Sequence, residues 1–249
     1  MRKRDILAAL AVGLGLWQAL VWITGAPHFI LPSPLRVANA LIHSREVIAE
    51  NALVTLQEII AGLILGTLLG VATAIQLTLS KTAERLMLPI LVFTQAVPVF
   101  ALAPVLTLWF GYGMASKIVM TVLIIYFPVT SAFHDGLTRV DRGLLDQAKI
   151  MGARPLQTLL RIQVPHALPS LGTGLRLAAV YAPIGAVIGE WVGASKGLGY
   201  LMLLANGRAK IDLMFASLIV LACLTVLLHT AIGVLSRQLV AYSEGRRLR

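Results

Sequence analysis

Long apolar stretches separated by short polar segments follow one another along this chain. At a rise of about 1.5 Å per residue, a run of about 18 or more apolar residues crosses a hydrocarbon core of about 30 Å. The runs are continuous rather than alternating, which disfavours a β-barrel. The pattern therefore predicts an all-α, polytopic membrane protein with six transmembrane helices. We place the spans at 6–23, 52–79, 86–110, 116–133, 169–190 and 213–236.

Composition agrees with this class. The chain is 58% hydrophobic and 13% charged, with a mean hydropathy of +0.85, too little polar surface for a soluble domain of 249 residues. We predict three parts: residues 1–51, an N-terminal transmembrane helix and external segment; residues 52–240, the core transmembrane domain including the loop 139–168; and residues 241–249, a cytoplasmic tail.

The net charge of +10 comes from cations in the loops, and these predict an orientation. One set of alternate loops holds 14 cations: Arg2, Lys3, Arg4, Lys81, Arg85, Arg139, Arg142, Lys149, Arg154, Arg161, Arg237, Arg246, Arg247 and Arg249. The other set holds six: Arg36, Arg45, Lys117, Lys196, Arg208 and Lys210. By the positive-inside rule the first set is cytoplasmic, so both termini and the 139–168 loop face the cytoplasm.

The first span follows Met1-Arg2-Lys3-Arg4, which also fits the start of a signal peptide. Because Pro27 follows the candidate cleavage site Thr24-Gly25-Ala26 and disfavours cleavage, we expect a retained helix. After it, Pro34 is expected to open a short interfacial helix at Leu35, with Ser33 as its cap.

Small residues recur every four positions in two spans, where they let helix backbones approach closely in lipid. The second span carries Gly62, Gly66 and Gly70, and the fifth carries Ala178, Ala182, Ala186 and Gly189. Prolines interrupt two others: Pro89, Pro98 and Pro104 in the third and Pro128 in the fourth. Broken helices are tolerated where they line a cavity, so the third span is either a pathway lining or a static kink.

Residues 139–168 are polar within an otherwise apolar chain. The first of two predicted short helices runs from Arg142 to about Met151 and ends at Gly152. The second opens at Pro155 and stops before Pro165. Leu144, Leu145, Ala148 and Met151 form an apolar stripe on the first helix. Such a hairpin either docks into a groove on a protein partner or rests on lipid.

Motifs for catalysis are absent from the sequence. There is no P-loop, H-E-x-x-H or G-x-S-x-G, no two of the five histidines have metal-ligand spacing, and the single Cys223 is expected to be a small buried residue. We predict neither catalytic residues nor a metal site. An ion-coupled secondary transporter stays open, with Glu58 and Glu190 as the intramembrane acids such a mechanism needs, although both lie near predicted span ends.

The loop also carries a spacing that points to a family. The loop contains Asp146-Gln147-Ala148-x-x-x-Gly152, then nine residues, then Ile162-x-Val164-Pro165. This pattern resembles the motif E-A-A-x-x-x-G, nine residues, I-x-L-P of the membrane subunits of binding-protein-dependent ABC importers. It differs by Asp146 for Glu, Gln147 for Ala and Val164 for Leu. Five further segments resemble the branch for sulfonates, taurine, nitrate and thiamine-precursor pyrimidines: Leu31-Pro32-Ser33-Pro34, residues 98–104, residues 110–113, residues 189–194 and residues 197–201.

The resemblance implies a type I permease that works as a homodimer in the bacterial inner membrane. A partner ATPase would hold ATP and magnesium, and a periplasmic or lipid-anchored binding protein would deliver the solute. The resemblance implies hydroxymethylpyrimidine, a thiamine precursor, as substrate, with alkanesulfonate, taurine or nitrate as the alternative. The residues implied in ATPase coupling are Leu145, Asp146, Gln147, Ala148, Gly152, Ala153 and Pro165.

Polar or aromatic residues in or beside the spans are candidates for lining the pathway. They are Gln95, Pro98, Tyr126, Tyr181, Glu190 and Trp191.

Overall fold

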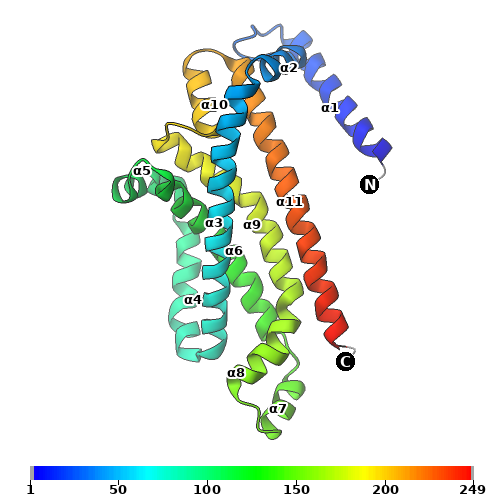
Figure 1. Ribbon diagram of the computed structural model, residues 1–249, viewed down its shortest axis with the longest axis vertical. Helices are drawn as coiled ribbons and strands as arrows, with labels where there is room; N and C mark the ends of the chain where they lie inside the picture. The colour runs from blue at the N-terminus through cyan, green and yellow to red at the C-terminus, as the bar shows by residue number, and fades with distance from the viewer. Residues whose placement is uncertain (1–2, 248–249) are drawn as a thin grey trace. The chain divides into compact units, whose positions relative to one another are not determined.

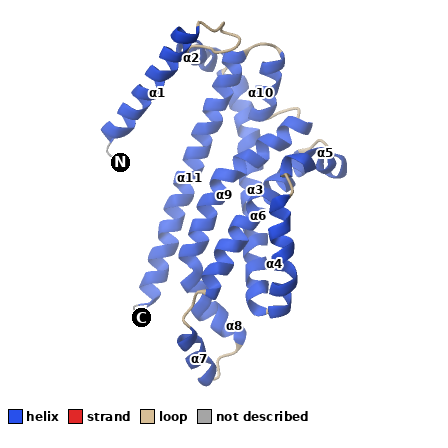
Figure 2. Cartoon of the chain, turned by 180° about the vertical axis from the view of Figure 1, so that it is seen from behind, coloured by secondary structure: helices blue, strands red, loops and turns tan. Residues whose placement is uncertain are grey.

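The computed structural model describes residues 3–247, in which every regular element is helical (Figures 1 and 2). The predicted all-α class is confirmed. Arg2 and Arg249, two of the cations used for the orientation, lie outside the described residues. In chain order the elements are α1 (Lys3–Thr24), α2 (Pro34–His43), α3 (Arg45–Leu79), α4 (Lys81–Ala96), α5 (Val99–Phe110), α6 (Met114–Thr138), α7 (Arg142–Ile150), α8 (Pro155–Thr158), the π-helix η1 (Leu159–Gln163), α9 (Val164–Gly193), α10 (Leu198–Gly207) and α11 (Ile211–Arg247).

Within the described residues, four helical segments are long and apolar enough to cross a membrane. They are α3, α6, the continuous segment Pro155–Gly193, and Ile211–Ala241 of α11. The pair α4 and α5 passes the same test when taken together, which makes five. The apolar part of α1, Ala8–Thr24, is shorter. Each predicted span thus coincides with a helix or a helix pair, and four or five of them have full spanning length.

The predicted span 86–110 consists of two helices, α4 and α5, which are bent by 100° at a short break. The break falls at Val97, which is extended (φ −81°, ψ 121°), and at Pro98, the N-cap of α5. A residue before proline is driven out of the helical region by the proline ring. Pro89 and Pro104 lie inside α4 and α5, so only one of the three prolines breaks the helix.

The chain divides into two compact units, residues 1–55 with 195–223 and residues 56–194 with 224–249. The predicted limits at residues 51 and 240 stay a prediction. In the first unit, the Trp17 indole donates to the Pro32 carbonyl (3.1 Å) and stacks on Phe215 with ring centroids 5.8 Å apart. Ser33 is the N-cap residue of α2, as predicted, but its side chain makes no capping hydrogen bond.

The small-residue stripe of α3 packs against α6 in the second unit. A Cβ placed on Gly62 would lie 2.5 Å from Thr121, and one on Gly66 would lie 2.7 Å from Ile125. Ala178, Ala182 and Ala186 of α9 join the same buried cluster, which includes Ile59, Leu63, Ile125 and Val129. These contacts confirm that the two stripes lie inside a helix bundle.

Cys223 is exposed, so the prediction of a buried cysteine is wrong. It lies on α11, where only 17% of the most apolar 18-residue window is buried within the chain. A side chain on such a surface faces lipid or another subunit rather than a core, and lipid accepts a small apolar residue equally well.

Candidate functional site: the polar hairpin and the ion cluster

The loop between α6 and α9 folds into the two-helix hairpin that the sequence predicts, at one end of both helices (Figure 1). Asp141 caps α7, because its Oδ1 accepts a hydrogen bond from the Leu144 backbone N–H (3.2 Å). The helix begins at Arg142 as predicted and ends at Ile150, one residue before the predicted end.

Gly152 ends α7 in the left-handed conformation, with φ +78°. Next to it, the Ala153 N–H reaches back to the Ala148 carbonyl (3.0 Å), the long-range bond of a Schellman C-cap. A Cβ at Gly152 would meet nothing within 4 Å. The glycine is therefore required by its backbone conformation rather than by crowding, and its position confirms the predicted end of the helix.

The second half of the hairpin continues into the next span without a break. Pro155 opens α8, and the Arg154 N–H donates to the Gln157 side chain (3.0 Å). The π-helix η1 then leads directly into α9. The predicted stop before Pro165 is wrong. Pro165 lies in the first turn of α9, and a wide π turn precedes it, so the missing N–H leaves no gap in the chain of helical residues.

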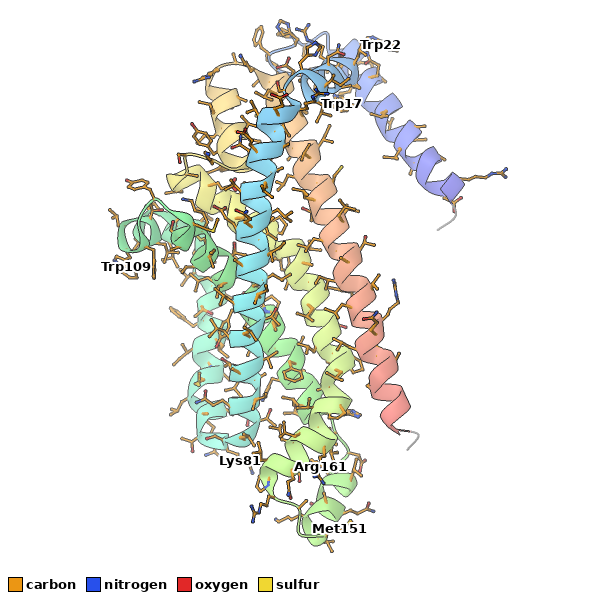
Figure 3. All side chains as sticks on the ribbon, viewed as in Figure 1. Trp17, Trp22, Lys81, Trp109, Met151 and Arg161 are labelled. Atoms are coloured by element: carbon orange, nitrogen blue, oxygen red, sulfur yellow. The ribbon has the colours of Figure 1, made fainter. Side chains whose placement is uncertain are left out.

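The apolar stripe predicted on α7 is only partly buried. Ala148 is buried and Leu145 is half-buried, whereas Leu144 is exposed. Ile150 and Met151 at the tip are each 86% exposed, and Figure 3 shows Met151 at the far end of the hairpin. The exposed flanks carry charge, from Arg142, Asp146, Lys149, Arg154 and Arg161. The hairpin thus presents an apolar tip framed by charged side chains.

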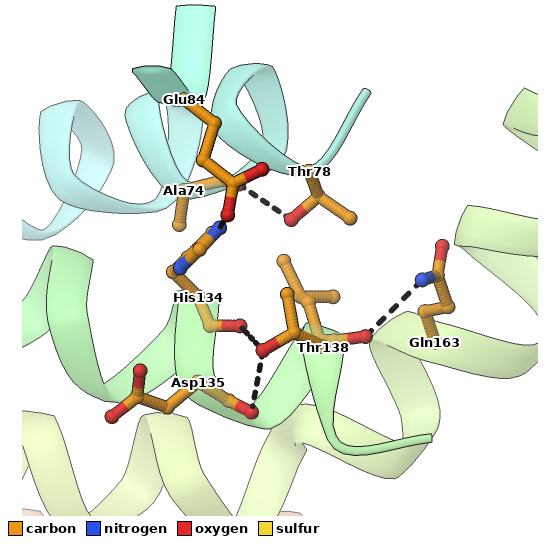
Figure 4. A network of polar contacts seen from close by, with 8 residues as sticks. Ala74, Thr78, Glu84, His134, Asp135, Thr138 and Gln163 are labelled. Carbon is orange, nitrogen blue, oxygen red and sulfur yellow. Dashed lines mark hydrogen bonds and ion pairs between the residues drawn. The ribbon is translucent and has the colours of Figure 1, made fainter. Parts of the chain in front are cut away.

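Two contacts attach the hairpin to α6, and the sequence analysis did not single out either. The Gln163 side chain donates to the Leu137 carbonyl (3.1 Å), and Leu159 is fully buried in a cluster with Phe133, Leu137 and Ala167. Nearby, His134 Nε2 lies 3.9 Å from a carboxylate oxygen of Glu84 (Figure 4), too far for a hydrogen bond. The hairpin is therefore attached to α6 and also continuous with α9.

The structure does not bring the six pathway candidates together. Gln95, Pro98, Tyr181 and Trp191 are exposed, and Tyr126 is half-buried with its hydroxyl 2.7 Å from the Thr73 hydroxyl. Glu190 is 1% exposed. It has no surface to offer a solute in this conformation.

Glu190 instead belongs to an ion cluster of three buried residues: Glu58 of α3, Lys117 of α6 and Glu190 of α9. The Lys117 ammonium donates to the carbonyls of Tyr112, Gly113 and Gly193, the last two at 2.8 Å. Both carboxyls act electrostatically on Lys117. The expected place of Lys117 is therefore corrected, because Lys117 is a buried residue of α6 and not a loop cation. Glu190 lies near the end of α9, as predicted, but it is buried.

The cluster escaped sequence reasoning because its members are far apart in the chain. Lys117 and Gly193, for example, are 76 residues apart. Lys117 also stands at the start of an apolar run, where a cation ordinarily marks the membrane surface. The available signal was an intramembrane charge balance, since a buried lysine requires acidic or carbonyl partners.

An all-helical bundle in which a polar hairpin is continuous with a spanning helix defines a class, the multi-pass membrane protein. Residues 62–241 match the family described as the binding-protein-dependent transport system inner membrane component. The chain belongs to this family. Its members are the permease subunits of ABC importers, which work with an ATPase and a binding protein. The chain is thus a transport subunit and not itself an enzyme.

Relatives cover nearly the whole chain. A probable ABC transporter permease protein of Haemophilus influenzae is 50% identical over 93% of this chain and 96% of its own length. A formylaminopyrimidine transport permease of Halalkalibacterium halodurans is 37% identical over 92% of both. A riboflavin transport system permease of Chloroflexus aurantiacus is 36% identical over 91% of this chain and 85% of its own. A putative aliphatic sulfonates permease of Bacillus subtilis is 29% identical over 93% and 85%.

Among solved structures, a chain of the MetNI methionine ABC transporter in inward facing conformations matches with a TM-score of 0.69 at 20% identity. The match covers 79% of this chain and 97% of that chain. At this identity it supports the fold alone, and the fold is that of a type I ABC importer permease.

Proposed function

We propose that this permease subunit imports a small polar heterocycle, with hydroxymethylpyrimidine or a related thiamine precursor as the best candidate. The support is the similarity to a relative named for formylaminopyrimidine at 37% identity, against 29% for one named for aliphatic sulfonates. The relative named for riboflavin, also a heterocycle, is almost as similar as the first. Alkanesulfonate, taurine or nitrate is the alternative cargo.

We further propose that the hairpin is the element that couples transport to ATP hydrolysis. The observation that carries this is the tip, where Ile150 and Met151 are each 86% exposed on a capped helix. Apolar side chains exposed in this way on a polar loop favour binding in a groove of a partner protein. The groove belongs to the partner ATPase, which also supplies the bound ATP and magnesium.

Within the hairpin, burial suggests a division of tasks among the coupling residues. Asp146 and Gln147 are exposed and available for contact with the ATPase. Ala148 and Pro165 are buried and hold the hairpin against the membrane domain. Gly152 and Ala153 fix the turn between the two helices through the C-cap. Leu145 is half-buried and takes part in both tasks.

The assembly that follows is a homodimer in the bacterial inner membrane, with both termini and the hairpin in the cytoplasm. The arrangement is supported by the position of Lys81, which lies at the same end of the helices as Arg161 and the hairpin tip (Figure 3). Cations gathered at one end are typical of the cytoplasmic side. A periplasmic or lipid-anchored binding protein delivers the solute at the other end.

A solute site along the pathway needs only weak affinity, because the binding protein selects the solute. Tyr126, Tyr181 and Trp191 are the candidates that keep an accessible aromatic surface. Stacking on an aromatic ring suits a pyrimidine better than it suits a sulfonate. We do not assign this task to Glu190, which is buried.

The coupling assignment is tested with Gly152→Trp. The new side chain meets no neighbour, so its effects are a backbone strain of about 1–2 kcal/mol in the left-handed region and a bulky group at the docking surface. Gly25→Trp is the matched control, because Gly25 has φ +57°, equally open surroundings and a place outside the hairpin. We expect Gly152→Trp to insert but to lose the ATPase on co-purification, and Gly25→Trp to retain it. Equal retention by both variants would contradict the assignment.

The cargo is tested by growth. A deletion strain that also lacks pyrimidine synthesis should fail on low external hydroxymethylpyrimidine and recover when this permease is supplied. Normal growth there, combined with failure on an alkanesulfonate as sole sulfur source, selects the alternative cargo. Uptake of labelled riboflavin in the same strain tests the third possibility directly.

A further inference from the structure

The Lys117 ammonium has no hydrogen-bond donor left for a carboxyl in this conformation. A lysine ammonium carries three N–H donors, and here they go to the carbonyls of Tyr112, Gly113 and Gly193. Tyr112 and Gly113 belong to the turn before α6, and Gly193 is the last residue of α9. Lys117 thus fixes the end of α9 to the start of α6.

The two carboxyls beside it are arranged differently. Glu58 and Glu190 share a side-chain hydrogen bond, which requires a proton on one of the two groups, because a carboxylate only accepts. With one proton and one ammonium, the ion cluster is neutral overall, as a buried site in a membrane domain favours. The Glu58 oxygen Oε2 is nevertheless buried without a hydrogen-bond partner. Such an acceptor is costly to leave unsatisfied.

We propose that Lys117 is a positioning residue that exchanges one acceptor during the transport cycle. It holds the Gly193 carbonyl in the present conformation, and it turns to Glu58 Oε2 when the end of α9 moves away. Each arrangement uses all three donors, and the second also satisfies the orphan oxygen. The two arrangements are therefore discrete states rather than a continuum, as a bistable element requires.

The position of the ion cluster gives this exchange its role. The second hairpin helix α8, the π-helix η1 and α9 form one continuous run of helical residues from Pro155 to Gly193. The hairpin is at one end of this run, and Lys117 of α6 binds the other end. The close approach needed for α9 to pass α6 is provided at Gly189, whose Cβ would lie 3.0 Å from the Lys117 side chain. The inference rests on the proposed function, because the movement it needs begins where the ATPase binds the hairpin.

Thiol labelling near Gly193 tests the exchange. Trp191 is 53% exposed in the last turn of α9, so Trp191→Cys in a Cys223→Ser background reports on this helix end. The maleimide labelling rate is measured on the complex with its ATPase in nanodiscs, nucleotide-free and after trapping with ATP and vanadate. For a coupling of ordinary size we expect at least about a fivefold difference between the two states.

Two variants and a control separate positioning from plain structural support. Glu58→Met keeps the length of the side chain but removes the oxygen that receives Lys117. It should leave the nucleotide-free labelling rate unchanged, because Lys117 does not hydrogen-bond to Glu58 in that state, and abolish the response to trapping. Lys117→Met should label at the faster rate in both states. Lys196→Met, at an exposed lysine near α9, should behave as the parent.

Each outcome decides the matter. A parent-like response to trapping in Glu58→Met overturns the exchange, whether or not Lys117→Met folds. A lower thermal midpoint in Glu58→Met together with an altered nucleotide-free labelling rate also overturns it, because structural support alone gives that result. If the parent itself does not respond while the ATPase is bound, the proposed coupling function fails, and that result is distinct from a parent that responds and a variant that does not.

Discussion

Close packing of α9 on α6 is the feature on which transmission through the second unit depends, and Gly185→Ala tests it. A Cβ on Gly185 would lie 2.7 Å from Thr121 Cα and 3.2 Å from Thr121 N. These are backbone atoms, so no side-chain rotation relieves the contact. The helices must separate, and overpacking of this kind costs about 1–3 kcal/mol.

Alanine also raises helix propensity over glycine by up to about 1 kcal/mol, which masks part of the cost. Gly233→Ala on α11 is the matched control, because a Cβ there meets nothing within 4 Å. The gain in helix propensity is the same in both variants, so the difference between their stabilities gives the cost of the contact with Thr121. At about 2–4 °C per kcal/mol for a chain of this size, the thermal midpoints should differ by about 2–12 °C.

The assay is thermal unfolding of both variants in the same detergent or nanodisc preparation, followed by retention of the soluble, folded fraction. Gly233→Ala should match or exceed the parent, and Gly185→Ala should lie below both. If Gly185→Ala is as stable as Gly233→Ala, then α6 and α9 are not packed as closely as described, and rigid transmission along them loses its basis.

Three further changes probe other parts of the account. Asp141→Ala removes the cap on the Leu144 N–H, a loss of about 1 kcal/mol, and amide exchange within α7 should rise while exchange in α6 does not. Gln163→Leu removes the bond to the Leu137 carbonyl, so uptake should fall several-fold while the ATPase still co-purifies; unchanged uptake would contradict a transmitting role. Reporter fusions at Ala205 and at the C-terminus should report opposite sides of the membrane, and the same side would refute the predicted orientation.

Local signals explain what the sequence predicted correctly in the hairpin. The start of α7 at Arg142 and its end beside Gly152 follow from residue types that act over one helical turn. The small-residue stripe at Gly62, Gly66 and Gly70 is likewise a local pattern. Each of these features depends on neighbours along the chain, and a single sequence is sufficient to reveal them.

The errors come from contacts between distant segments and from prolines whose effect depends on place. Pro98 separates two helices, whereas Pro165 lies in the first turn of α9 and does not interrupt the helix. Lys117 was assigned to a loop because its partners, Glu58 and Gly193, belong to other helices. Burial of an ion is decided by the assembled bundle. The nearby acceptors, at Tyr112 and Gly113, are backbone carbonyls, which carry no sequence signal.

The central claim is that the hairpin tip docks on the partner ATPase, and site-specific crosslinking tests it most directly. A photo-crosslinking side chain is placed at Met151, which is 86% exposed at the tip, and for comparison at Trp109, which is 75% exposed on α5. In the intact complex the account predicts a crosslink to the ATPase from position 151 and none from position 109. A complex that retains its ATPase but gives no crosslink from position 151, or gives equal crosslinking from both positions, would contradict it.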